Sequence, residues 1–124
     1  MAVTPYCTKE DYAFKRAKLT WADYADAFNY PTEDGLEDML QESTAIINVA
    51  MGRSEDSNLT THPTFLRNLC YRMVRLMEQE ELGEAEGDYN RFIPKDYLYE
   101  RDRNRLLRFG REAGYIKFGG VTSG

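Results

Sequence analysis

The chain has few of the residues from which small active sites and disulfide scaffolds are built. Of its 124 residues, two are cysteine and one is histidine. Cys7 lies near the start and Cys70 inside an apolar helical pattern, so there is neither a disulfide framework nor a zinc-ligand spacing, and we expect both thiols to be reduced. His62 directly precedes Pro63, a position that favours a capping or solvent-facing role over catalysis. With no nucleophile motif and no glycine-rich phosphate loop, we expect no catalytic residue, no metal and no cofactor.

Long hydrophobic runs are also lacking. Charged residues between Lys9 and Lys18 exclude the apolar region of a signal peptide, and no apolar run reaches the length that spans a bilayer. We therefore expect a soluble, unsecreted chain with no membrane segment.

Positive charge is in deficit as well. The formal net charge is -5 and the pI is about 4.9. Binding that wraps nucleic acid draws its free energy from clustered Lys and Arg, so the overall balance argues against it. The length suits one domain with a real core.

What the chain does contain is two strong helical patterns. One runs from the N-cap residue Thr32 to Gly52, and the other from Pro63 to Gly83. Apolar residues recur in both at steps of three and four. They are Leu36, Met39, Leu40, Ile47, Ala50 and Met51 in the first, and Phe65, Leu66, Leu69, Cys70, Met73, Val74, Leu76 and Met77 in the second. Stripes of this width need another helix as cover.

Weaker patterns flank these two helices. Thr8 followed by Asp11 predicts a capping box that opens a short helix to about Lys18. Residues 19–31 are aromatic-rich and form either a short helix or a packed loop. A further helix is predicted from near Pro94 to Gly110 or Gly114, and the last residues are expected to form a short strand or a partner-bound tail.

The sequence thus predicts an all-α fold, a small bundle of about four helices with an extended C-terminal helix and tail. Residues 1–90 are expected to hold the bundle core. Residues 91–124 are expected to form, within the same domain, a projecting helix and a partner-binding tail. The reason is that residues 100–105 are polar throughout, and a helix polar over that length is expected to project beyond its bundle.

Charge is unevenly distributed along the chain. Residues 76–90 carry six acids and no basic residue, whereas the C-terminal stretch is rich in arginine, including Arg101, Arg105 and Arg108. Such polarity suits head-to-tail contacts between copies or with a partner, although solvated helix faces that differ in sign explain it equally well. The arginines could contact phosphate, but acids alternate with them, so we favour pairing at a protein interface.

A second acidic cluster marks the start of the first strong helix, where Glu33, Asp34, Glu37, Asp38 and Glu42 follow at helical spacing. These carboxylates could gather Mg²⁺ or Ca²⁺. Acids at a helix N-terminus are favourable without a metal, and we prefer that explanation.

Nine tyrosines and one tryptophan exceed what a small core readily buries. Trp21, Tyr24, Tyr30 and Tyr97 are therefore predicted to meet another subunit, because aromatic residues are enriched at interfaces.

A resemblance to a known family is carried by two groups of residues. They are Tyr6, Thr8, Glu10 and Asp11 before a short helix, and Leu40, Ser43, Thr44, Ile47, Asn48, Gly52 and Arg53 after an acidic helix start. From about Tyr6 to Leu82 this pattern resembles the head-to-tail connector, or adaptor, proteins of long-tailed phages. The family's motif consists of common residues. The long charged final helix and the aromatic segment 21–30 depart from it, which leaves the orientation of the C-terminal half undetermined.

The resemblance implies a nonenzymatic virion protein that forms a ring of roughly a dozen copies in the neck between head and tail, after assembly in the host cytoplasm. Such a ring docks under the portal protein, meets a tail or stopper protein and passes DNA without reading its sequence. The portal contact would then involve Arg101, Arg105, Arg108, Tyr115, Ile116, Lys117 and Phe118. An acidic channel lining would come from Glu78, Glu81, Glu84 and Glu86, or from the face from Glu33 to Glu42.

Two alternatives remain open from sequence. A small helical regulator or DNA-binding module would use the Arg-rich helix, and a metal-dependent enzyme would use the acidic helix start.

Overall fold

The computed structural model describes residues 4–82 and 93–116 of the chain. It contains five helices in this part and no strand, which confirms the predicted all-α fold. They are α1 (Lys9–Ala17), α2 (Trp21–Ala27), α3 (Glu33–Ala50), α4 (Thr64–Leu82) and α5 (Glu100–Glu112). Among these helices, none is long and apolar enough to cross a membrane.

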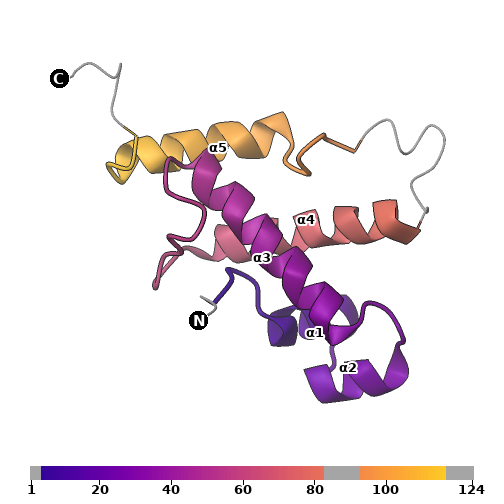
Figure 1. The fold of residues 1–124 in the computed structure, drawn as a ribbon. Coiled ribbons are helices and arrows are strands. Elements are labelled where there is room, and N and C mark those ends of the chain that lie inside the picture. Colours follow the sequence, from indigo (N-terminus) through magenta and orange to yellow (C-terminus); the bar gives the residue numbers. More distant parts are fainter. Residues whose placement is uncertain (1–3, 83–92, 117–124) are drawn as a thin grey trace.

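Two long helices, α3 and α4, form the centre of the fold. They cross one another and share the most extensive helix contact, with α1 and α2 near the start of α3 and α5 across its far end (Figure 1). The apolar stripes predicted for both face inward, and Leu36, Leu40 and Ile47 of α3 pack with Leu66 and Met73 of α4 in the core. The 3.6-residue period of the stripes is thus sufficient to orient both helices.

Threonine caps start the first three helices. The hydroxyl oxygens of Thr8, Thr20 and Thr32 accept hydrogen bonds from backbone N–H groups three residues later, at 3.1 to 3.2 Å. At Thr8 the Asp11 carboxylate also accepts from the Thr8 N–H, so the predicted capping box is confirmed. The cap at Thr20 settles the aromatic segment as a short helix.

The C-terminal helix starts later than predicted. Residues 93–99 form turns because Tyr97 has a left-handed φ of 62° and its N–H donates to the Pro94 carbonyl at 3.1 Å. Asp96 Oδ1 accepts from the Leu98 N–H, and the buried Leu98 side chain anchors the turn in the core.

That helix also does not project from the bundle. Asp102, Leu106 and Gly110 are buried, and α5 packs against α3. Gly110 permits the close approach, because a Cβ there would lie 2.9 Å from the carbonyl carbon of Met51 at the end of α3. The prediction was wrong because its polar residues occupy the outer face, while a narrow apolar edge is enough for packing.

Candidate functional site

The three arginines predicted to contact a partner lie on one exposed face of α5. Arg101, Arg105 and Arg108 follow at steps of four and three residues, which aligns them along one side of a helix. The Arg105 guanidinium carbon lies 4.0 Å from the centre of the Phe65 ring, and Arg101 Nε lies 3.8 Å from Asp102 Oδ1. The Arg101 side chain is 78% exposed. The structure therefore brings the three together as one charged surface.

The segment after α5 turns back onto the molecule. The N–H groups of Tyr115 and Ile116 both donate to the Gly110 carbonyl, at 2.8 and 3.2 Å, and Gly114 supplies the positive φ of 86° that this turn requires. The Tyr115 ring lies 4.6 Å from the Arg53 guanidinium carbon. The expected strand is therefore not present at Tyr115 and Ile116, and both side chains are half-buried against their own chain.

Tyr24, one of the four aromatic residues predicted for a subunit interface, belongs to the core. It is only 1% exposed, stacks with Trp21 and Phe28 at ring distances of 5.6 and 4.6 Å, and meets Tyr12 edge-on at 5.7 Å. A residue enclosed in this way cannot meet another subunit, so the prediction for Tyr24 was wrong. The aromatic cluster instead holds α2 against α1.

The other three aromatic residues stay partly accessible. Trp21, Tyr30 and Tyr97 are half-buried. The Tyr30 hydroxyl donates to Glu81 and the Tyr97 hydroxyl to Glu80, both near the end of α4. The Glu80 bond, together with burial, raises the pKa of Tyr97 to about 12.

The acid Glu78, predicted to line a channel, is buried with 2% of its surface exposed. The Tyr12 hydroxyl donates to its Oε2, and Arg75 donates to its Oε1 at 2.6 Å. Burial, and then the bond to Glu78, raises the pKa of the Tyr12 phenol. Because its carboxylate faces the junction of α1 and α4, Glu78 cannot line an aqueous channel and that prediction was wrong.

The remaining acids of this prediction divide in two. Glu81 is exposed on the last turn of α4. Glu84 and Glu86 lie outside the described residues, as do Lys117 and Phe118 of the predicted portal contact.

The acidic start of α3 is partly neutralised by α1. Lys9 Nζ binds Glu33 and lies 3.6 Å from Glu37 Oε2, whereas Asp34 and Asp38 are exposed and make no ion pair with any described residue. No group of three or more acids, histidines or cysteines in the described part is arranged to hold a metal ion. The acids instead form a negative face beside α1.

Residues that carry the family resemblance converge on a buried polar junction. The Tyr6 N–H donates to Thr44 Oγ1 at 3.1 Å, and the Tyr6 hydroxyl donates to Asn48 Oδ1 while accepting from the Leu59 N–H at 2.9 Å. Asn48 Nδ2 donates to the Glu55 carbonyl at 3.0 Å. The junction ties the N-terminal segment and the loop 51–63 to α3, and His62 closes it with its ring 4.8 Å from that of Tyr6.

Both cysteines are buried and free. Burial raises the pKa of the Cys70 thiol to about 11 and raises that of Cys7 as well. Neither thiol is therefore an ionised nucleophile.

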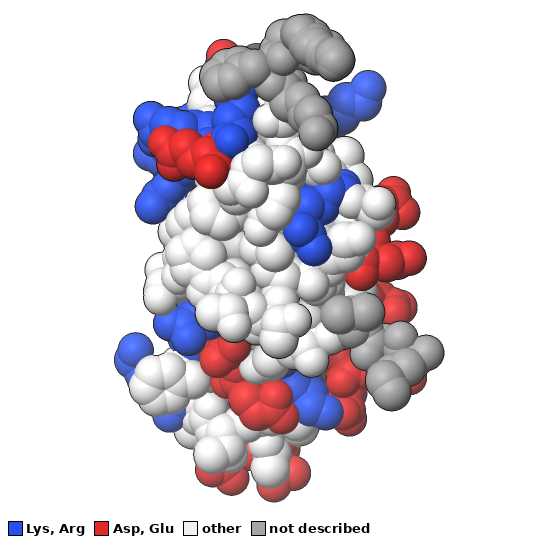
Figure 2. All heavy atoms as spheres, turned by 90° about the vertical axis from the view of Figure 1, so that its left-hand side faces the viewer, with Lys and Arg blue, Asp and Glu red and all other residues white. Residues whose placement is uncertain are grey.

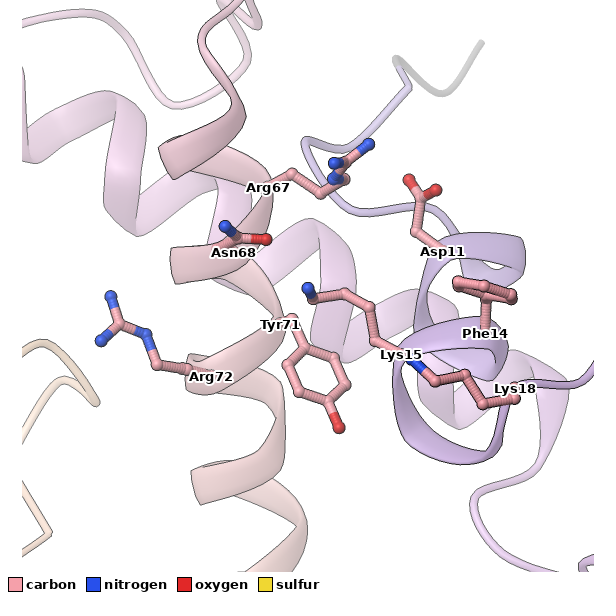
Figure 3. A pocket seen from close by; sticks show the side chains of 8 residues that line it. All are labelled: Asp11, Phe14, Lys15, Lys18, Arg67, Asn68, Tyr71 and Arg72. Atoms are coloured by element: carbon pink, nitrogen blue, oxygen red, sulfur yellow. The ribbon is translucent and has the colours of Figure 1, made fainter.

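A basic groove between α1 and α4 is a feature that sequence reasoning missed. It has a volume of about 500 Å³ and is lined by Asp11, Phe14, Lys15 and Lys18 of α1, and by Arg67, Asn68, Tyr71 and Arg72 of α4 (Figure 3). On α1 these residues follow at i, i+3, i+4 and i+7, a pattern visible in the sequence as one helix face. Its neighbour across the groove is set only by the tertiary fold.

The face of the molecule toward the ends of α3 and α5 is different in character. Uncharged side chains cover its middle, and charged side chains lie around its margin (Figure 2). The loop sequence Ser57–Thr64 contains no Asp, Glu, Lys or Arg.

Comparisons with known proteins leave the family open. No family model matches the chain, and no solved structure matches it. The E-type component of the V-type proton ATPase of Thermoanaerobacter pseudethanolicus is 34% identical over 84 residues, or 65% of this chain. The chain spans only 40% of the length of that ATPase component. It is similar to part of that protein, and this likeness does not assign it to a family.

Proposed function

We propose that this protein is a nonenzymatic structural subunit of a viral head-to-tail connector ring. The ring, of roughly a dozen copies, docks to the portal protein in the neck of the virion, meets a tail or stopper protein and extends the channel through which DNA passes. Assembly takes place in the host cytoplasm, without a membrane and without sequence-specific DNA binding.

One observation carries the proposal. Residues of the family resemblance that are far apart in sequence, including Tyr6, Thr44, Asn48 and Arg53, meet around the junction of the N-terminal segment, α3 and the following loop. Arg53 holds that loop by donating from Nε to the Ser57 carbonyl at 2.7 Å. A resemblance made of common residues gains weight when its members share one structural task, because chance matches have no reason to be neighbours.

The proposed roles take account of which side chains are available. Arg101, Arg105 and Arg108 would face the portal, with Tyr115 and Ile116 holding the base of the segment that continues to Lys117 and Phe118. Trp21, Tyr30 and Tyr97 would lie at contacts between copies. Glu81, Glu84 and Glu86 would face the channel, where negative charge repels the phosphates of passing DNA.

Electron microscopy of the protein mixed with the portal ring of the same virus tests the proposal. We compare the full chain with a version ending at Ile116, which keeps the turn onto Gly110, and with the triple variant Arg101→Ala/Arg105→Ala/Arg108→Ala. Extra ring density at the narrow end of the portal, weakened in both altered proteins, is expected. A portal that stays bare at saturating full-length protein contradicts the proposal. Lys95→Ala, an exposed change outside α5, is the control.

A second candidate is favoured by the exposed arginine face of α5. A helical DNA-binding module would use these side chains to contact phosphates, and its affinity would fall steeply with salt. Titration of duplex DNA at two salt concentrations separates the candidates. Strong, salt-sensitive binding lost in the triple arginine variant favours the DNA-binding module, and weak binding unaffected by that variant favours the connector.

A further inference from the structure

The basic groove between α1 and α4 contains cations without ionic partners. Lys15, Lys18 and Arg67 make no ion pair with any residue in the described ranges. The one acid in the groove, Asp11, is bound to the Thr8 N–H in the capping box. Uncompensated positive charge stands out in a chain with a net charge of -5.

The groove also has an apolar edge. Phe14 is 58% exposed, with Lys18 Nζ 4.9 Å from the centre of its ring. Lys15 extends from α1 toward α4 with its Nζ 5.5 Å from the centre of the Tyr71 ring, whereas Arg72 points away from α1 and pairs with Asp102 at 3.4 Å (Figure 3). Aromatic rings therefore hold the two lysines at the groove, with their ammonium groups directed to an outside partner.

The surface with complementary charge is the acidic start of α3. Asp34 and Asp38 are exposed, lack ion pairs within the described part of the chain, and lie one helical turn apart on the same face. They cannot fill the groove of their own chain, because Lys9 of α1 contacts Glu33 and Glu37 on the α3 side, and the groove opens between α1 and α4.

We infer that the groove between α1 and α4 binds the acidic N-terminal turns of α3 of a second copy of this chain. The two surfaces differ, so the contact is heterologous, and each copy has both halves of it. Repeated contacts of this type build either a closed ring or an open filament. The inference rests on the proposed function for the closed ring and deepens it by naming the contact between copies.

Charge reversal tests the contact in the protein alone. A groove variant, Lys15→Glu/Arg67→Glu, and an acid variant, Asp34→Lys/Asp38→Lys, each place like charges at the contact. Sedimentation at low salt is expected to show self-association weakened by about tenfold or more in each. Association returns when the two variants are mixed, and also when all four changes are combined in one chain. Only a contact between these two surfaces gives this pattern.

Two controls separate the contact from general effects. Lys95→Glu/Arg108→Glu makes the same change in net charge at exposed positions outside the groove and should leave association unchanged. Lysine at the start of α3 opposes the helix dipole, so the amide variant Asp34→Asn/Asp38→Asn is measured in parallel and should also weaken association. Circular dichroism shows whether each variant keeps its helices.

Zero-length crosslinking gives an independent readout. In a mixture of ¹⁴N- and ¹⁵N-labelled protein, mixed-isotope crosslinks are expected between Lys15 or Lys18 and Asp34 or Asp38. Three results overturn the inference: a wild-type protein that stays monomeric at high concentration, unimpaired association of both reversed variants, or binding of DNA by the groove in place of a second copy. Portal binding is scored separately, so a bare portal with an intact copy-to-copy contact refutes the function alone.

Discussion

Replacing Gly110 with alanine should separate α5 from α3. The added Cβ would lie 2.9 Å from the Met51 carbonyl carbon and closer still to its oxygen, both backbone atoms that cannot rotate away. Relief requires α5 to shift outward, which loosens the packing of the buried Leu106 on the same helix face.

The magnitude follows from two opposing effects. Overpacking of this kind costs up to about 3 kcal/mol, whereas alanine is favoured over glycine inside a helix by about 1 kcal/mol. We therefore expect Gly110→Ala to lower the free energy of unfolding by roughly 2 kcal/mol. For a chain of this size the melting temperature should fall by roughly 8 °C.

Thermal and urea unfolding followed by circular dichroism measure the effect. Asn104→Ala, at an exposed position of the same helix, isolates the propensity effect and should be neutral or slightly stabilising. Gly114→Ala has space around its Cβ but a positive φ of 86°, and so isolates backbone strain, at about 1 kcal/mol. If Gly110→Ala is as stable as Asn104→Ala, the close packing of α5 on Met51 is refuted.

Three further predictions concern buried or bonded groups. Glu78→Ala leaves the Tyr12 hydroxyl and Arg75 without their shared acceptor, so urea unfolding should show a loss of about 2 to 3 kcal/mol, against less than about 1 kcal/mol for the exposed control Glu81→Ala; equal losses would contradict the buried network. Because the pKa of Tyr97 is raised to about 12 from its ordinary 10, the folded state keeps a proton that the unfolded chain has lost, and stability should fall as pH rises through this interval. Tyr97→Phe should reduce that slope, and an unchanged slope counts against the Glu80 bond. Cys7 and Cys70 should react with a thiol reagent no faster than the protein unfolds, and rapid reaction in native buffer would disprove their burial.

The elements themselves were largely predictable because their signals are local. The stripes of α3 and α4 have the helical period, and Thr8, Thr20 and Thr32 satisfy N–H groups within three residues of themselves. The start of α5 was misplaced, since Pro94 resembles a first-turn proline, while the turn at Tyr97 depends on the burial of Leu98.

Individual site residues were harder to predict, because exposure depends on contacts that are distant in sequence. Glu78 and Glu81 lie three residues apart in one acidic run, yet one is buried against Tyr12 and the other is exposed. Tyr24 resembles an interface aromatic in composition, but its neighbours Trp21, Phe28 and Tyr12 enclose it.

By itself, the sequence determined the all-α class, the two central helices and the alignment of arginines on α5, because helical period and capping act between residues a few positions apart. Only the tertiary structure decided that α5 packs against α3, that Glu78 is buried and that α1 and α4 enclose a basic groove. Each of these depends on segments that meet across long sequence separations, through steric fit at Gly110 or through the pairing of charges, and local patterns carry no record of such meetings.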